Sequence, residues 1–283
     1  MSLNSVNTNM GAMVALQSLE STQNQLSVTQ KQISTGYRVS DSTDDGAAYA
    51  IAQGIRSTVG ALTSANQQLG NVQGLLSTTQ SGLTHISNMM GSMRDVLLKL
   101  SDSSVQGNER KNYETQYTSM LANVKTFVQD ANYNGKTLIG DLTGSSGSFG
   151  RVAVARNENG STYGIASFSG SAMFGSISFT TTQLSGASTV AALVTATGIF
   201  LNQQNSVGTE LNSVGSSINY VNNQTTYNND KVNALNSGLG SLIDADLAKE
   251  SAQLTALQIR QQLGTQALSM ANQAPQTLLS LFK

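Results

Sequence analysis

Apolar side chains recur at alternating spacings of three and four residues along two long stretches of the chain. This spacing places an apolar stripe along a helix, and the stripe has to be buried against another helix. The first stretch covers residues 48–100, and 14 of its 16 stripe positions are apolar. A helix of this length spans about 80 Å, which exceeds a globular-domain helix and indicates a coiled coil. Its central stripe residues include Leu69, Leu76, Leu83, Ile86 and Leu97.

A second stretch, Val190 to Leu242, has 12 apolar residues among 16 stripe positions, including Leu211, Val214, Ile218 and Val221. Because the two stretches are nearly equal in length, we expect them to form one antiparallel pair of helices. A local helical hairpin within some other fold is the alternative. Six glycines lie off the stripe of the first helix, where they either admit neighbouring chains closely or are merely tolerated.

A third, shorter stripe runs from Tyr113 to Phe127 and predicts a helix that ends near residues 132–135. The short connection over residues 101–108 makes it an antiparallel neighbour of the first helix.

Weaker stripes run near both ends of the chain. The N-terminal stripe includes Leu16 and Leu19 but has Gln23 and Gln30 in its seam. The C-terminal stripe is also interrupted, and Pro275 lacks the N–H needed to continue a helix, so it should kink or end that helix. We expect both helices to be marginal in the free chain and to become ordered when partners cover them.

The centre of the chain is rich in Gly, Ser and Thr and differs from the helical stretches. Alternating runs over residues 149–156 and 161–168 flank Asn159-Gly160, which is a strong signal for a β-hairpin. The run Met173–Thr180 could add a further strand. We expect residues 161–189 to face solvent. The predicted fold class is mainly α, an elongated rod of long antiparallel helices with paired termini and a small central β-hairpin region.

Composition changes this picture in one respect. Ser, Thr, Asn and Gln make up 115 of 283 residues, while only 11% of residues are charged and the net charge is −1. This balance excludes a strongly basic nucleic-acid binder as a default, and the absence of Cys excludes disulfides and thiolate metal sites. There is no run of about 18 apolar residues and no basic signal region at the N-terminus. A surface with so little charge promotes association, which indicates self-assembly.

The sequence shows no catalytic constellation, so we predict no enzyme activity and no cofactor. A Ser-His-Asp triad would need His85, the single histidine, which lies inside the first long helix. There is no P-loop and no strand-linked dinucleotide-binding fingerprint.

Two blocks of sequence at opposite ends of the chain carry a specific resemblance. The first reads ISTGYRVSDSTDDGAAYAIA over residues 33–52. The second covers residues 243–283 and includes LGTQALSMANQAPQTLLSLFK. Together they closely resemble bacterial flagellin, the subunit of the flagellar filament, and the likeness extends over residues 1–140 and 186–283.

The resemblance implies a domain plan. Residues 1–42 and 243–283 correspond to the inner coiled-coil domain, and residues 43–140 and 186–242 correspond to the helical rod domain. Residues 141–185 are then a small β-rich insert of the rod domain, and this segment is too short to hold large outer domains.

The resemblance also implies a function and its partners. The chain would be exported by the flagellar type III apparatus, assembled at the distal tip, and secreted into an extracellular filament for swimming. Implied partners are further copies of the chain or other flagellins, an export chaperone at the C-terminal helix, and the cap and hook-junction proteins. Nucleic acid and membrane are not among them. A hook-filament junction protein of the same family is the alternative, whereas a coiled-coil adhesin would need a signal and an anchor.

The candidate assembly residues are apolar stripe residues of the two terminal helices together with a charged turn. Asp41, Asp44 and Asp45 suit the cap of a helix that begins near Gly46, and the resemblance implies that they and Arg38 also bridge subunits. The complete set is Leu16, Leu19, Leu26, Ile33, Arg38, Asp41, Asp44, Asp45, Leu254, Leu257, Leu268, Pro275, Leu278, Leu281 and Phe282.

Two surface properties can also be predicted, the first from the resemblance and the second from the composition of the centre. The family's innate-receptor pattern is matched at Arg94 and Asp95, but Ser92 and Gln116 replace an arginine and a glutamate, so recognition should be weak. The Ser/Thr-rich centre is a candidate region for O-linked glycans. Its candidate residues are Ser161, Thr162, Ser167, Ser169, Ser171, Ser176, Ser178, Thr180, Thr181 and Thr182.

Overall fold

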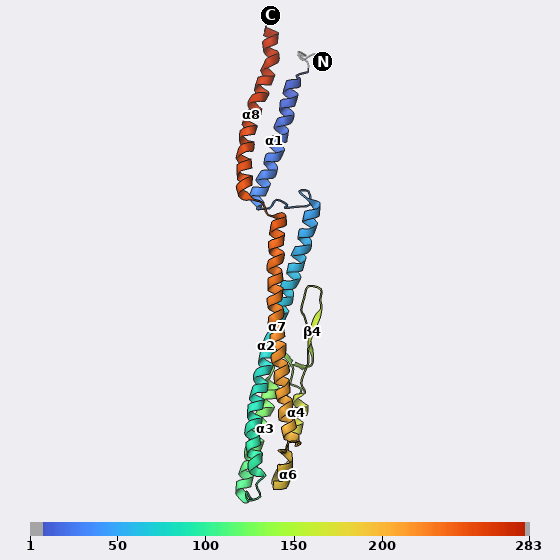
Figure 1. Ribbon diagram of the computed structural model, residues 1–283, viewed down its shortest axis with the longest axis vertical. Coiled ribbons are helices and arrows are strands. Elements are labelled where there is room, and N and C mark those ends of the chain that lie inside the picture. Colours follow the sequence, from blue (N-terminus) through green and yellow to red (C-terminus); the bar gives the residue numbers. More distant parts are fainter. Residues whose placement is uncertain (1–7, 281–283) are drawn as a thin grey trace. The chain divides into compact units, whose positions relative to one another are not determined.

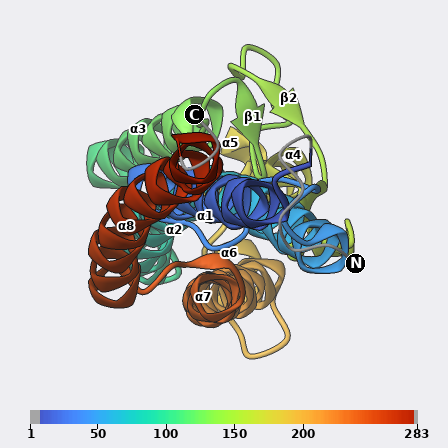
Figure 2. The ribbon, with the colours of Figure 1, turned by 90° about the horizontal axis from the view of Figure 1, so that it is seen from above.

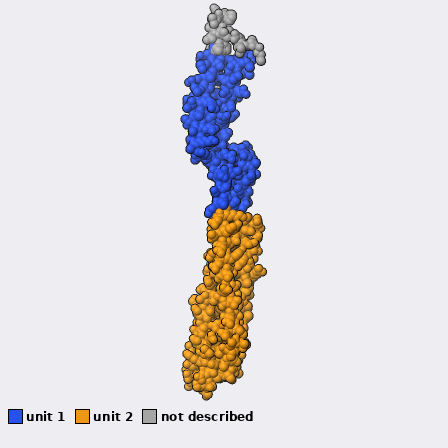
Figure 3. All heavy atoms as spheres, viewed as in Figure 1, with its two compact units in different colours: residues 1–58, 233–283 blue, residues 59–232 orange. Residues whose placement is uncertain are grey.

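The computed structural model describes residues 8–280, and residues 274–280 through their backbone alone. The chain is mainly helical, as the sequence predicts, and it has four short strands among the described residues. It divides into two compact units, which Figure 3 colours separately. Unit 1 contains the described residues up to Thr58 and from Asn233 onward, and unit 2 contains residues 59–232.

Three long helices build unit 2: α2 (Gly46–Leu100), α3 (Gly107–Asp130) and α7 (Ile199–Ile243), of which α2 and α7 continue into unit 1 (Figure 1). The Asn66 side chain donates to Asn229 Oδ1 and the Gln73 side chain to Asn222 Oδ1, both at 2.8 Å, so α2 and α7 run antiparallel. The predicted pairing of the two long helices is therefore present.

Helix α3 is also antiparallel to α2. Near its start Arg110 donates to the carbonyl oxygen of Leu100 at 2.7 Å, and near its end Phe127 stacks on His85 with ring centroids 5.4 Å apart. His85 thus has a packing role on the flank of α2.

The core of unit 2 is the α2 stripe together with facing residues of α3 and α7. Every stripe position from Leu62 to Leu100 is buried, because α3 and α7 cover this face from two sides. Val214 and Val221 of α7 are buried, while Leu211 and Ile218 are half-buried and pack against the same cluster. The buried α2 residues include Leu69, Leu76, Leu83, Ile86 and Leu97.

The first part of α2 departs from the predicted stripe. Ile51 is 56% exposed, and its neighbour Ala52 is fully buried together with Val39 and Ile243. A helix with 3.6 residues per turn drifts by about 20° per heptad relative to a strict seven-residue repeat. The prediction that places Ile51 in the seam is wrong for this reason.

The second stripe is not one helix. Val190 and Leu193 lie in α6 (Ala187–Leu193), a turn follows over residues 194–198, and α7 begins at Ile199. β-Branched residues dominate this turn and disfavour helix, and Gly198 closes it by donating to Thr195 at 2.8 Å. A Cβ at Gly198 would lie 2.2 Å from the Leu193 carbonyl oxygen, so this close approach requires glycine.

The central segment contains the predicted hairpin. Strands β3 (Val152–Ala155) and β4 (Thr162–Ile165) pair antiparallel with Val152 opposite Ile165. Gly160 adopts a φ of 73° in the turn between them. A second pair, β1 (Lys136–Thr137) and β2 (Ser148–Phe149), is parallel, and Figure 2 shows its strands side by side.

The expected strand over residues 173–180 is a helix instead. Helix α4 (Gly170–Ile177) is capped by Ser169, whose hydroxyl accepts from Ala172 N at 3.1 Å, and it buries Met173 and Ile177 one turn apart. A short helix, α5 (Thr181–Ser185), follows. The expectation that residues 161–189 face solvent is thus wrong for their apolar positions, which cover the core of unit 2.

The six off-stripe glycines of α2 fall into two groups. A Cβ at Gly74 would meet the Tyr133 ring at 2.6 Å, and one at Gly82 would meet Ala131 Cβ at 3.1 Å, so these two admit close packing within the chain. A Cβ would meet nothing within 4 Å at the other four, Gly54, Gly60, Gly70 and Gly91.

A fully buried asparagine joins α2, α7 and the hairpin. Asn228 donates to Asn66 Oδ1 at 2.8 Å and to the Arg156 carbonyl oxygen at 3.0 Å. The hairpin is held further by a Tyr163–Tyr220 stack with centroids 3.9 Å apart. A buried amide with partners on two other elements fixes their register, because any slip leaves it unsatisfied.

The variant Asn228→Ala tests this link. It leaves the Asn66 and Arg156 oxygens without a buried donor, so the free energy of unfolding should fall by about 1–3 kcal/mol. Thermal unfolding followed by circular dichroism measures the change. The exposed Asn223→Ala on the same helix is the control and should stay within about 0.5 kcal/mol of the unsubstituted chain. Equal effects of the two variants would contradict the role of Asn228.

Candidate assembly surface on the terminal helices

Helices α1 (Met10–Thr35) and α8 (Leu247–Ser280) pack as an antiparallel pair in unit 1 (Figure 1). The Asn9 side chain caps α1 by accepting from Ala12 N at 3.1 Å and donates to the Ala271 carbonyl oxygen at 2.7 Å. Further along, a Cβ at Gly264 would lie 3.2 Å from Leu19 Cδ1, so the two helices approach closely there. The predicted pairing of the terminal segments is present.

The contact face of α1 differs from its predicted stripe. Thr22 and Thr29 are 5% and 2% exposed, whereas Gln23 and Gln30 lie on the surface. Thr22 satisfies its hydroxyl by donating to the Ser18 carbonyl oxygen at 2.9 Å. A small β-branched side chain permits the close approach that a glutamine would prevent, so the placement of the glutamines in the seam is wrong.

Most of the candidate apolar assembly residues lie on this intramolecular contact. Leu257 is buried, and the others are half-buried between or beside the two helices: Leu19, Leu26, Ile33, Leu254 and Leu268. Leu16 is the exception, because 46% of it is exposed. Leu281 and Phe282 lie outside the described residues, as do the side chains of Pro275 and Leu278. Helix α8 continues to Ser280, so Pro275 does not end it.

Each of the two helices also keeps large apolar side chains exposed outside its contact with the other helix. These side chains are about half or more exposed: Met10, Met13, Val14, Leu16 and Val28 on α1, and Leu247, Ile259, Leu263 and Met270 on α8. Several of the α1 members line a surface hollow together with Gln17 and Glu20. The predicted single stripe of each helix leaves these residues out, although the off-stripe residues Met13 and Leu263 indicate them in the sequence. We call these nine residues the second apolar face.

The connector between α1 and α2 is hydrogen-bonded to the end of α7. The Arg38 backbone N–H donates to the Ile243 carbonyl oxygen at 2.7 Å, and its guanidinium donates to the Leu242 carbonyl oxygen at 2.6 Å. Ala245 N donates to the Gly36 carbonyl oxygen at 2.9 Å. Arg38 therefore has a role within the chain, and its remaining guanidinium donors stay available.

Lys31 holds the acidic turn against α1. Its ammonium group lies 2.6 Å from Asp41 Oδ2 and 2.9 Å from Asp44 Oδ1. Hydrogen bonds from Lys31 and Thr43 hold the pKa of Asp41 far below its usual range, and Lys31 with the Ser40 backbone N–H lowers the pKa of Asp44. Asp45 caps α2 by accepting from Ala47 N and Ala48 N, as the sequence predicts.

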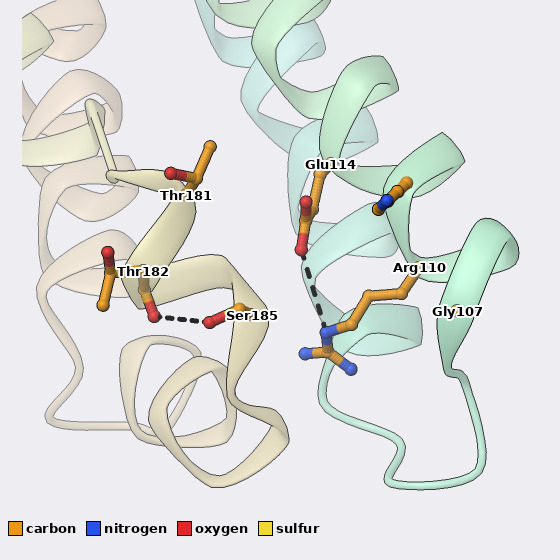
Figure 4. A pocket seen from close by; sticks show the side chains of 7 residues that line it. Gly107, Arg110, Glu114, Thr181, Thr182 and Ser185 are labelled. Carbon is orange, nitrogen blue, oxygen red and sulfur yellow. Dashed lines mark hydrogen bonds and ion pairs between the residues drawn. The ribbon is translucent and has the colours of Figure 1, made fainter.

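The side chains that line the polar hollow between α3 and α5 form contacts within the chain. Figure 4 shows this hollow, where the Arg110 and Glu114 side chains approach to 3.9 Å. Arg110 is nine-tenths buried and donates to the carbonyl oxygens of Leu184 and Leu100, which ties the end of unit 2 together. No group of three His, Asp or Glu residues that could hold a metal occurs within residues 8–280. None of the helices in that range combines the length and apolar content needed to cross a membrane.

The candidate glycan hydroxyls are of two kinds. Those of Ser169 and Ser171 donate to Asp141, that of Ser176 bonds to the Ala172 carbonyl oxygen, and that of Thr180 belongs to the α5 cap. Ser161 is half-buried in the hairpin turn. Among the described residues the remaining candidate hydroxyls have no hydrogen bond, and these belong to Thr162, Ser167, Ser178, Thr181 and Thr182.

The sequence matches two family models, the bacterial flagellin N-terminal helical region over residues 6–143 and the bacterial flagellin C-terminal helical region over residues 201–282. It is 31% identical to flagellin FljM of Caulobacter vibrioides over 283 residues, covering 100% of both chains. It is also 31% identical to a flagellin of Brucella melitensis over 295 residues, covering 99% of each. Among solved structures it is similar to Bacillus cereus flagellin, with 16% identity, a TM-score of 0.37, and coverage of 66% of this chain and 94% of that chain.

The variant Lys31→Met tests the contact between α1 and the acidic turn. Because the pKa values of Asp41 and Asp44 are lowered in the folded chain, their contribution to stability is complete above the unfolded-state pKa of about 4. It is lost progressively as the pH falls below that value. Lys31→Met should therefore lower the unfolding temperature at neutral pH, and the difference from the unsubstituted chain should shrink in acid.

Thermal unfolding by circular dichroism at neutral pH and at about pH 2 measures this difference. Lys125→Met is the matched control, because Lys125 is exposed and has no ion pair among the described residues. A difference for Lys31→Met that persists undiminished in acid would show that the ion pairs are not its cause.

Proposed function

The chain belongs to the bacterial flagellin family, and from this premise we propose that it polymerises into the flagellar filament that drives swimming. Flagellins are structural proteins of the extracellular filament and not enzymes. The single observation that carries the assembly proposal is the second apolar face, because α1 and α8 keep it exposed even when they are paired with each other.

Neighbouring subunits cover this face in the proposed filament. A large side chain that goes from half exposed to buried contributes roughly 1 kcal/mol, and each subunit of a helical lattice repeats such contacts with several neighbours. The sum offsets an association cost of roughly 4–15 kcal/mol. Leu19, Leu257 and Leu268 then support assembly indirectly, because they hold α1 and α8 together and so present the second apolar face.

The charged turn is a second proposed contact between subunits. Asp41 and Arg38 are partly exposed although each has partners within the chain. Asp44 forms an ion pair with Lys31, and Asp45 caps α2, so both carboxylates already have partners within the chain. We therefore propose that Arg38 and Asp41 carry the bridging role.

Export through the flagellar type III apparatus and assembly at the distal tip complete the proposal. Because the chain has no Cys, its export requires no reduction or formation of disulfides. Leu247, Ile259, Leu263 and Met270 give α8 an apolar surface that an export chaperone could cover before assembly. The filament cap and hook-junction proteins are further proposed partners. Weak innate-receptor recognition is proposed because Ser92 and Gln116 are exposed where the family pattern has charged residues.

Seeded polymerisation tests the proposed function. The purified protein is heated until it is monomeric and is then cooled in the presence of filament seeds. Negative-stain electron microscopy shows whether long helical filaments form. Leu263→Gln should slow elongation by about tenfold or more, because it places an amide in an apolar contact. The control Leu263→Met keeps the apolar volume and should elongate normally.

Two outcomes would contradict the proposal. An unsubstituted chain that binds seeds without elongating them would favour the hook-filament junction protein. Normal elongation by Leu263→Gln would remove the second apolar face from the assembly contact.

A further inference from the structure

The described methionines of the two units differ in their solvent exposure. Met90, Met93 and Met173 in unit 2 are at most 1% exposed, and Met89 and Met120 are half-buried against the same core. The three described methionines of unit 1 are all more than half exposed, at 55% for Met10, 57% for Met13 and 66% for Met270.

These three residues lie at one end of the α1–α8 pair. Asn9 donates to the carbonyl oxygen of Ala271, and a Cβ at Gly11 would lie 4.0 Å from Ala271 Cβ, so Met10 and Met270 flank a direct contact between the helices. Met13 follows Met10 by one turn of α1, and both line the open hollow on that helix. All three belong to the second apolar face.

We propose that Met10, Met13 and Met270 form an oxidation site through which peroxides block assembly of the free subunit. The inference rests on the proposed function, because it concerns the surface that assembly would bury. Methionine is flexible and adapts to different apolar partners, which suits such a surface, but its thioether is open to oxidation wherever solvent reaches it.

The reaction needs one molecule of hydrogen peroxide for each methionine. A sulfur lone pair attacks one peroxide oxygen, the O–O bond breaks, and a sulfur–oxygen bond forms. Sulfur is oxidised by two electrons to the sulfoxide, and the other peroxide oxygen leaves with two protons as water. The product is polar and chiral, and enzymes of the methionine sulfoxide reductase class reverse it.

Oxidation and assembly should therefore exclude each other. A sulfoxide on the second apolar face opposes burial against a neighbour, because its oxygen would lose hydrogen bonds to water. Conversely, a subunit already in a filament has these thioethers covered and should resist peroxide. The buried methionines of unit 2 should resist it in both states.

Peptide mass spectrometry after a timed peroxide treatment of the monomeric full-length chain tests the site itself. Met10, Met13 and Met270 should be oxidised about tenfold or more faster than Met90, Met93 and Met173. Equal rates for the two groups would overturn the assignment. This measurement needs no polymerisation, so it remains decisive even if the proposed function fails.

Seeded elongation before and after peroxide treatment tests the consequence. The oxidised chain should elongate about tenfold or more slowly than the untreated chain. The triple variant M10L/M13L/M270L should elongate at the same rate with and without treatment, whereas the control M89L/M120L should stay sensitive. Failure of the untreated chain to elongate would count against the proposed function alone.

Normal elongation of the oxidised chain would overturn the inference. Loss of elongation by the peroxide-treated triple variant would also overturn it. That variant retains only Met1 and the methionines of unit 2, so the loss would arise from oxidation at another methionine.

Discussion

A pair of helices can bury only one face of each member, and this constraint governs the terminal segments of the chain. Helices α1 and α8 carry apolar side chains around more of their circumference than one partner can cover. The pair uses Thr22, Thr29, Leu257 and the close approach at Gly264 for its own contact. What remains is the second apolar face, which two paired helices cannot bury without further partners.

Unit 2 meets the same constraint in a different way. Its α2 stripe is covered by α3 and α7 together with the small helices of the central segment, so that few large apolar residues stay exposed there. Buried polar side chains at Asn228 and Arg110 then fix the register of these elements. The chain thus combines a unit whose core is closed with a helix pair whose apolar surface is left open. The second feature is what an assembling subunit requires.

The sequence predicts the elements that rest on periodicity better than those that rest on local detail. The α2–α7 pairing, the α3 hairpin with α2 and the β3–β4 turn follow from repeats and from Asn159-Gly160. The break at residues 194–198 does not, because apolar spacing continues through it. Helix α4 is missed because Met173, Ile177 and their neighbours also fit an alternating pattern, and the Ser169 cap decides between the two. The exposure of Ile51 depends on helix drift that a strict seven-residue repeat leaves out.

The candidate site is predictable in location but not in detail. The terminal helices are identified from the end blocks, yet which of their faces is free depends on packing that threonine allows and glutamine does not. A helical reconstruction of the native filament would show which side chains of α1 and α8 are buried between subunits. We expect Leu19 of α1 to stay in contact with Gly264 of α8 within each subunit, and Met13, Leu16 and Leu263 to contact neighbouring subunits. A filament in which these three side chains face open solvent, with Leu19 and Leu257 between subunits instead, would contradict this expectation.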